Sequence, residues 1–200
     1  MTMNEGSRMT ARLAAGLTAA GIAVLVLGGC DSGTSPTTPV DDALEAVRRS
    51  TAPFQNLATA AAAGYTVWSP DPMAANATCA GDPQGKMGYH LVNTGLRGSP
   101  ADPGAGDPVI DPNRPEMLLF EKRPDGSMRL VGVEYLVFKA AWDRAHPGGA
   151  PPTVFGQPLP LSRHTFVAGG PEIDHYELHV WLHSTNPNGI MHPWNPTITC

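Results

Sequence analysis

The sequence predicts an α+β fold in which an N-terminal helical region packs on a mostly antiparallel β-sheet. Three observations favour this class. Apolar residues recur at helical spacing only in residues 40–65, and the later apolar runs are short and often alternate with polar residues. The chain also contains 22 glycines and 21 prolines, which is typical of a fold with many tight turns. A small β-barrel or β-sandwich with a peripheral helix is the alternative architecture.

The helical region, VDDALEAVRRSTAPFQNLATAAAAGY, spans residues 40–65. Asp41 or Asp42 is expected to cap its start, because acidic side chains are favoured at the positive end of a helix. Pro53 is expected to kink or split the segment, and Gly64 to end it. The apolar positions expected to pack on the sheet are Leu44, Val47, Phe54, Leu57 and Ala61. A partner-binding amphipathic helix is the alternative.

Short apolar or alternating runs predict five strands, at residues 65–68, 86–92, 115–122, 127–139 and 173–183. The Asp125-Gly126 pair between the third and fourth runs is typical of a tight β-hairpin. Residues 94–114 and 143–172 are rich in Pro, Gly and Asp. We expect long loops there, and loops of that length in a compact domain tend to be functional or mobile.

Residues 1–29 have the features of an export signal. Arg8 and Arg12 precede the apolar stretch 13–29, which is too short and too poorly flanked for a transmembrane helix. The stretch leads into Leu27-Gly28-Gly29-Cys30, which resembles the lipobox of bacterial lipoproteins. The resemblance implies that Cys30 carries acyl chains such as palmitate, which hold the mature protein on a membrane surface. A soluble secreted protein in which Cys30 is incidental is the alternative.

Residues 30–42 are expected to be a flexible membrane tether, because their Ser, Thr, Pro, Gly and Asp side chains bury too little apolar surface to fold. Residues 43–200 then form a single globular domain. The formal net charge of the whole chain is −5 and no basic run is present, so the sequence excludes nucleic acid as an expected partner. We expect a protein anchored to the outer face of a bacterial cell membrane, or to the periplasmic side of an envelope membrane.

Cys79 and Cys200 are expected to pair once Cys30 carries the lipid. An exported chain meets oxidising conditions, in which two remaining cysteines form a disulfide. The bridge would close a long loop and stabilise the fold by about 3–5 kcal/mol in the chain-entropy model. Two free thiols are the alternative, and the absence of a C-x-x-C motif argues against a thiol redox enzyme.

Glu134 is the one charged residue in the middle of the predicted strand 127–139, both faces of which are apolar. The expected rows are Leu130, Gly132, Glu134, Leu136 and Phe138 on one face and Val131, Val133, Tyr135 and Val137 on the other. A carboxylate in an apolar row must be paired, hydrogen-bonded, metal-bound or protonated. Glu134 is therefore either a buried structural residue, or a ligand or general base.

The predicted strand 173–183 has one apolar and one polar face. The expected rows are Tyr176, Leu178, Val180 and Leu182 in the core and His175, Glu177, His179, Trp181 and His183 opposite them. A solvated face is the ordinary interpretation in an antiparallel sheet. Side chains two apart on one face lie about 6.5–7 Å apart, so the imidazoles need ligands from another strand to close a metal site.

His90 alternates with Gly88 and Val92 on the predicted strand 86–92. If this strand is adjacent to strands 127–139 and 173–183, then His90, Glu134 and His179 can meet. Two imidazoles and a carboxylate that leave open coordination positions are a ligand set for zinc or non-haem iron. The spacing matches no metal motif such as H-E-x-x-H, and a satisfied core histidine is the alternative for His90.

Residues 184–200 are rich in turn-forming pairs such as Asn188-Gly189. Trp194 is expected to fill the core or cover a strand end, with stacking on a ligand as the alternative. His192 precedes Pro193 and is expected to be exposed rather than to bind a metal.

Five motifs resemble a set of small exported bacterial proteins that are known as hypothetical proteins without an assigned activity. The motifs are AAGY (62–65), MGYHLVN (87–93), DPNRPEMLLFE (111–121), LVGVEYLV (130–137) and HVWLHSTNPNGIMHPWNPTITC (179–200). The resemblance covers most of residues 45–200 and implies no function. It implies that His90, Glu134 and His179 belong to the family pattern, whereas the positions of His183 and His192 are often not histidine.

Three hypotheses follow for the function. The first is a lipid-anchored envelope protein with a metal- or small-molecule-binding pocket at His90, Glu134 and His179. Residues expected near that pocket, or as secondary ligands, are Tyr89, Tyr135, His175, Glu177, Trp181 and His183. The second hypothesis is a metal-dependent enzyme that uses the same residues, with Glu134 as ligand or base. The third is a non-catalytic interaction module that uses the loops at 94–114 and 143–172.

Overall fold

The computed structural model describes residues 38–75 and 77–200. The predicted signal peptide, the lipidation site Cys30 and most of the predicted tether lie outside these residues. Within the described ranges, no helix combines the length and the apolar character that crossing a bilayer requires.

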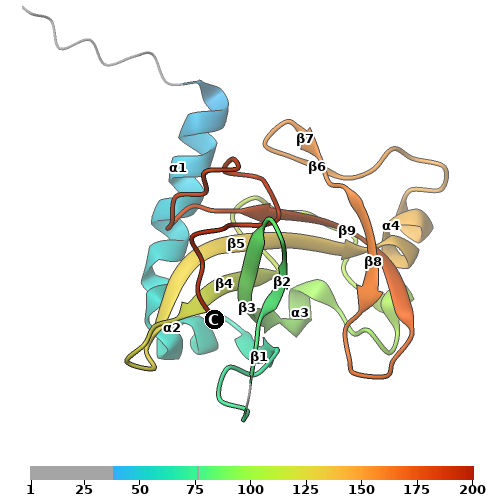
Figure 1. Ribbon diagram of the computed structural model, residues 1–200. Helices are drawn as coiled ribbons and strands as arrows, with labels where there is room; N and C mark the ends of the chain where they lie inside the picture. The colour runs from blue at the N-terminus through green and yellow to red at the C-terminus, as the bar shows by residue number, and fades with distance from the viewer. Residues whose placement is uncertain (1–37, 76) are drawn as a thin grey trace, which may run out of the picture. The chain divides into compact units, whose positions relative to one another are not determined.

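A seven-stranded open sheet forms the centre of the domain (Figure 1). Its main path runs β1–β3–β4–β5–β9–β8 with antiparallel neighbours, and β2 adds to β3 off this path. The strands are β1 (Tyr65–Ser69), β2 (Ala80–Asp82), β3 (Gly85–Asn93), β4 (Met117–Lys122), β5 (Met128–Phe138), β8 (Leu161–Thr165) and β9 (Glu172–Val180). The predicted α+β class is confirmed, and the sheet does not close into a barrel over the described residues.

The predicted helical region is divided into α1 (Pro39–Thr51), the 3-10 helix η1 (Ala52–Gln55) and α2 (Leu57–Ala62). Pro53 lies at the start of η1, where it splits the helix as predicted. The cap is different from the prediction, because the N-cap is Thr38 rather than Asp41 or Asp42. Asp41 instead completes a capping box, in which its N–H donates to the Thr38 hydroxyl. This box starts the helix at Pro39, inside the segment predicted to be a tether.

The N-terminal helices α1, η1 and α2 cover one face of the sheet, and the main apolar core lies between them and the strands (Figure 1). Leu44, Val47 and Ala60 supply the buried helical side chains. Their partners on the strands include Tyr89, Leu91, Leu118, Phe120, Val133, Tyr135, Val137, Leu178 and Val180. Leu57 and Ala61 were predicted to join this core but are exposed, because the 3-10 turn at Pro53 changes the helical register before α2.

A β-bulge changes the faces of β5. The ladder between β4 and β5 shifts between Leu119 and Phe120, which leaves Val131 as an extra residue. The prediction placed Leu130 with Glu134 and Val131 on the opposite face, and both placements are wrong. Leu130 joins the helix-side core, whereas Val131 packs on the second face. The predicted alternation holds beyond the bulge, and it aims Glu134 away from the helices.

The two stretches predicted as long loops contain short elements. Residues 94–114 include α3 (Thr94–Arg97) and the 3-10 helix η2 (Pro103–Ala105). After α4 (Lys139–Ala145), residues 146–172 include β6 (Thr153–Val154), β7 (Gln157–Pro158) and β8. β8 was not predicted, because its sequence, LSRHT, has a single apolar residue and no hydrophobic alternation. It nevertheless pairs with β9 along the edge of the sheet.

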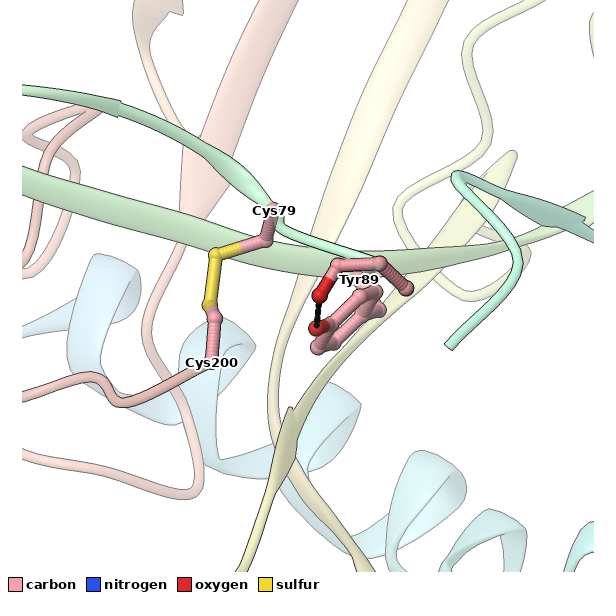
Figure 2. Close-up of a disulfide and its surroundings, with 4 residues drawn as sticks. Cys79, Tyr89 and Cys200 are labelled. Carbon is pink, nitrogen blue, oxygen red and sulfur yellow. Dashed lines mark hydrogen bonds between the residues drawn. A yellow bond between two sulfur atoms is a disulfide. The ribbon is translucent and has the colours of Figure 1, made fainter. Parts of the chain in front are cut away.

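Cys79 and Cys200 form the predicted disulfide (Figure 2). Their Cα atoms are 5.8 Å apart, and their positions are separated by 121 residues in the sequence. Close by, the Tyr89 hydroxyl donates a hydrogen bond to the Ala77 carbonyl at 3.0 Å, which holds the segment before Cys79 against β3. A closed loop of this length stabilises a fold by about 4–5 kcal/mol in the chain-entropy model.

Candidate metal centre

The face of the sheet opposite the helices carries a cavity of about 670 Å³. Histidines and glutamates from β3, β5, β8 and β9 supply its polar groups. Its apolar lining consists mainly of Trp68, Pro70, Met87, Met117, Phe166, Ala168 and Trp194. A concave and largely apolar site with a few convergent polar groups is the usual form of a ligand pocket.

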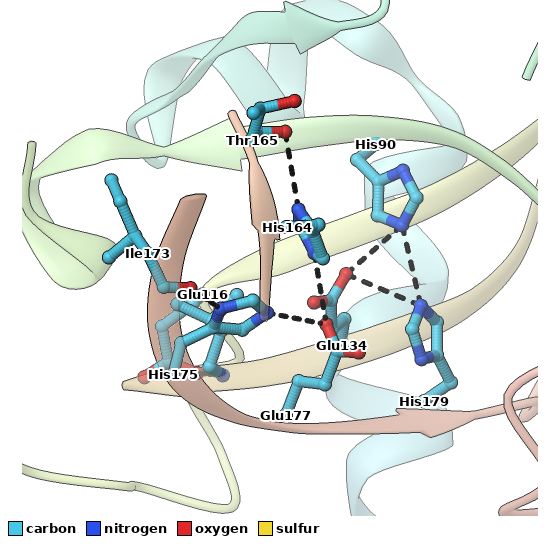
Figure 3. A network of polar contacts seen from close by, with 10 residues as sticks. His90, Glu116, Glu134, His164, Thr165, Ile173, His175, Glu177 and His179 are labelled. Carbon is cyan, nitrogen blue, oxygen red and sulfur yellow. Dashed lines mark hydrogen bonds and ion pairs between the residues drawn. The ribbon is translucent and has the colours of Figure 1, made fainter. Parts of the chain in front are cut away.

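His90, Glu134 and His179 meet at this cavity (Figure 3). Glu134 and His179 are direct cross-strand partners on β5 and β9. The prediction required adjacent strands, but β4 lies between β3 and β5. His90 pairs with Leu119 of β4, which pairs in turn with Gly132, and Gly132 presents no side chain on this face. The imidazole of His90 therefore reaches Glu134 across two strand spacings.

The three ligand atoms are close together and shielded from water. Nε2 of His90 is 3.0 Å from Oε2 of Glu134, Nε2 of His179 is 3.5 Å from the same oxygen, and the two nitrogens are 3.4 Å apart. The exposed fractions of the three side chains are 12% for His90, 3% for Glu134 and 1% for His179. Such a buried group of polar atoms must be stabilised by a proton, a metal ion or hydrogen bonds.

Oε2 of Glu134 is a buried oxygen that makes no hydrogen bond to any of the described residues. The nearest nitrogen is Nε2 of His90 at 3.0 Å, and this contact is an ion pair only when the imidazole carries a proton. Leaving a buried carboxylate oxygen in this state costs about 1–3 kcal/mol or more. Short contacts without hydrogen bonds are typical of metal ligands, which face a common point rather than one another.

The spacing of the three atoms fits a small metal ion. An ion bound at about 2.0–2.1 Å in tetrahedral geometry spaces its ligand atoms about 3.3–3.4 Å apart. The observed separations of 3.0, 3.4 and 3.5 Å surround that value. Two imidazoles and one carboxylate leave coordination positions open for water or a ligand. A metal ion in such a site can attract an anion, polarise a carbonyl or acidify bound water.

Burial and the neighbouring carboxylates shift the pKa values of the two imidazoles in opposite directions. Burial lowers the pKa of His90, but the charge and contact of Glu134 outweigh it, so that the pKa is raised. Burial dominates for His179, and its pKa is lowered despite the charges of Glu134 and Glu177. His90 therefore holds a proton more readily than His179, and a metal ion would compete with a proton at this position.

A second group of possible ligands, His164, His175 and Glu177, lies beside the first (Figure 3). Glu177 lies on β9 two residues before His179, and His164 comes from β8. Nε2 of His175 is 3.1 Å from Oε2 of Glu177, and Nε2 of His164 is 3.6 Å from the same oxygen. Glu177 and His164 line the same cavity as the first group.

The second group satisfies its own hydrogen bonds, unlike the first. Nε2 of His175 is hydrogen-bonded to Oε2 of Glu177 at 3.1 Å, and its Nδ1 is hydrogen-bonded to the Ile173 carbonyl at 2.8 Å. Burial raises the pKa of Glu177, but the contacts with His164 and His175 outweigh it and the pKa is lowered. Oε2 of Glu177 therefore has the hydrogen bond that Oε2 of Glu134 lacks among the described residues, and we take the first group as the better metal site.

Sequence reasoning missed two ionisable residues of the cavity, His164 and Arg97. His164 lies on the polar edge strand β8, where alternation gave no indication. Arg97 ends α3, in a stretch predicted as a loop, and only its position just after the MGYHLVN motif pointed toward the site. It is 6% exposed, and its guanidinium carbon lies 5.5 Å from the centre of the Phe166 ring.

The structure does not bring His183 and Tyr135 to the cavity. β9 ends at Val180, so the predicted alternation does not extend to His183. Nε2 of His183 instead lies 3.0 Å from the Thr51 hydroxyl on α1, and burial lowers its pKa. Tyr135 is on the helix-side face, where its hydroxyl donates to the Pro112 carbonyl at 2.6 Å.

The remaining candidates lie around the cavity or behind it. Trp181 is buried beside His179, with ring centres 6.5 Å apart, and its Nε1 donates to the His192 carbonyl at 2.7 Å. Trp194 was expected to fill the core or cover a strand end, but it is half-buried and lines the cavity. His192 was expected to be exposed, but it is half-buried within its turn. Tyr89 belongs to the helix-side core.

No protein-family model, curated protein or solved structure matches this chain. Its class is therefore defined by the fold and the site themselves. It is an α+β domain with an open antiparallel sheet, the N-terminal helices on one face and a cavity lined by histidine and glutamate on the other.

Proposed function

We propose that this protein is a lipid-anchored cell-envelope protein whose domain binds a metal ion through His90, Glu134 and His179. The observation that carries the metal site is Oε2 of Glu134, which is buried between two imidazole nitrogens and makes no hydrogen bond to the described part of the chain. Zinc and iron(II) are the ions that suit two imidazoles and a carboxylate with open positions. The cavity beside these positions has room for a small molecule.

Location in the envelope is supported by three features. The sequence ending at Cys30 resembles a lipobox, which implies a lipid anchor. The disulfide between Cys79 and Cys200 is typical of a protein that matures in an oxidising compartment. The chain is acidic and has no basic run, so the anchor rather than electrostatic attraction would hold it to the membrane.

The metal site is tested by elemental analysis of the full-length protein, purified without added metal. We expect about one zinc or iron per chain in the wild type. Glu134→Gln keeps the size of the side chain but replaces an anionic ligand by a neutral amide, so this variant should lose the metal. Glu177→Gln is the matched control, because Glu177 lies in the same cavity and is hydrogen-bonded to His175.

Two results would overturn the metal site. One is a wild-type protein that contains no stoichiometric metal and takes up neither zinc nor iron when these are added. The other is equal loss of metal from Glu134→Gln and Glu177→Gln, because a site built on Glu134 predicts that the control keeps its metal.

A further inference from the structure

Arg97 is a cation at the edge of the proposed metal centre that forms no ion pair with the residues the structure describes. The side chain is almost fully buried and lines the cavity. Its Nε donates to the Gly98 carbonyl at 3.3 Å, and its two terminal nitrogens make no hydrogen bond to the described residues. No carboxylate among those residues lies within 4.0 Å of the guanidinium, although buried charges are normally paired.

The nearby carboxylates are already engaged by imidazoles. Glu134 lies between His90 and His179, and Glu177 lies between His164 and His175. Arg97 feels the charge of Glu134 but makes no direct ion pair with Glu134 or Glu177, so an anion that enters the cavity would be its direct partner. A divalent ion at the proposed centre would add further positive charge and would favour an anion there.

The cavity also indicates what kind of anion fits. A planar guanidinium matches the two oxygens of a carboxylate, which it can bind through two parallel hydrogen bonds. Trp68, Phe166 and Trp194 make much of the remaining surface apolar, and Phe166 holds the guanidinium from one side. An apolar wall suits a ligand with a hydrocarbon or aromatic body better than a wholly polar ion such as phosphate.

We propose that the cavity binds a small monocarboxylate with an apolar body, whose carboxylate is recognised by Arg97 beside the metal held by His90, Glu134 and His179. This inference rests on the proposed function, because the metal supplies part of the positive charge. It adds the chemical class of the ligand and the residue that selects it. Arg97 would act as a specificity-determining residue and not as a metal ligand.

Calorimetric titration of the zinc-loaded, full-length protein with benzoate and hexanoate tests the proposal. Benzamide and hexanamide serve as neutral probes of the same shape, and inorganic phosphate as a wholly polar anion. We expect the two carboxylates to bind and the amides and phosphate to bind at least about tenfold more weakly. Zinc content is measured on the same samples.

Arg97→Met removes the charge and keeps a long apolar side chain. It should weaken carboxylate binding by about tenfold or more while zinc content stays at the wild-type level. Arg97→Lys keeps the charge without the planar fork and should also bind carboxylates more weakly, which provides a second test if Arg97→Met does not fold. Arg144→Met is the matched control, since Arg144 is exposed on α4 away from the cavity lining.

Each other outcome decides the question. Wild-type affinity for carboxylates in a zinc-containing Arg97 variant would overturn the proposal, as would equal affinity of the wild type for acids and amides, or no binding of either acid. A wild type that holds no zinc would refute the metal centre instead. In that case the same titrations are made on the metal-free protein. Carboxylate binding that depends on Arg97 would support the carboxylate site, and a lack of such binding would refute it.

Discussion

Three glutamates in the polar network of Figure 3 are alike in sequence and differ in their surroundings. Glu134 has a buried oxygen without a hydrogen bond, and Glu177 is hydrogen-bonded to His175. Glu116 is buried, forms no ion pair with the described residues, and accepts a hydrogen bond from the Leu136 backbone N–H at 3.0 Å. The same side chain therefore provides a metal ligand candidate, an ion-paired group and a neutral acid within one part of the sheet.

Glu116 should make the stability of the protein depend on pH. Burial is the main reason that its pKa is raised from 4.5 to about 8, and the charges of Glu134 and Asp107 add to the shift. The folded state thus keeps a proton that the unfolded chain releases near pH 4.5. Stability should therefore fall as the pH rises from about 4.5 to about 8, by roughly 1.4 kcal/mol for each unit of pKa shift.

Glu116→Gln isolates this effect, because the amide can accept the Leu136 hydrogen bond and cannot ionise. Free energies of unfolding are measured by urea titration at several pH values in the presence of a chelator. Groups present in both proteins, including Glu134 and Asp107, largely cancel in the difference. The variant should gain stability relative to the wild type between pH 5 and pH 8. A difference that stays constant over this range would show that Glu116 does not titrate as described.

At the scale of residues, the sequence pointed to the metal ligands better than to the rest of the cavity. Glu134 was visible because a carboxylate in an apolar row demands a partner, and His179 because it alternates with core residues. Arg97 was not visible, since its burial depends on how the segment after β3 folds over the sheet. The bulge at Val131 was also not predicted. An extra residue in one strand of a pair does not change the composition of an apolar run.

At the scale of elements, the position of His90 on β3 depends on Gly88, which lies two residues before it. Gly88 has a φ of +84°, and a Cβ added there would lie 2.7 Å from the Phe120 carbonyl oxygen on β4. The close approach of the two backbones keeps His90 in register with its neighbours on the sheet. A side chain at position 88 would push β3 away from β4 and would displace His90 from Glu134.

Gly88→Ala and Gly126→Ala separate this close approach from backbone strain. Gly126 has the same φ of +84°, but a Cβ there would meet nothing within 4 Å. Gly126→Ala should cost about 1–2 kcal/mol from the left-handed backbone alone, and Gly88→Ala should cost more. Only Gly88→Ala should weaken zinc binding in a calorimetric titration. Equal loss of stability and equal zinc affinity in the two variants would contradict the role assigned to Gly88.

The elements themselves were largely visible in the sequence where their burial is asymmetric. β1, β3, β4, β5 and β9 were predicted from apolar runs, and their bounds differ from the prediction by a few residues. β9 ends at Val180 rather than at residue 183, so His183 does not follow the alternation of the strand and does not reach the cavity. β8 was invisible because an exposed edge strand has little need for apolar residues.

At the scale of the whole molecule, the proposed anchor predicts where the protein is found in the cell. Wild-type protein should sediment with membranes after cell fractionation, whereas Cys30→Ser should appear in the soluble exported fraction. Cys79→Ser is the control, because it also removes a cysteine but leaves the proposed lipidation site. Continued retention of Cys30→Ser in membranes would refute the lipid anchor.

The disulfide also determines how the molecule would respond to mechanical force. The bond between Cys79 and Cys200 makes the intervening chain a closed covalent ring, which contains all three proposed metal ligands and Arg97. Tension between a membrane anchor and Cys200 would enter the fold through α1 and leave it through the disulfide, without loading the chain between the two cysteines. It can peel away α1, α2 and β1, but it cannot stretch the ring unless the sulfur–sulfur bond breaks. Under load, the helical cover is therefore the part that yields, and the strands that carry the histidines are the part that is protected.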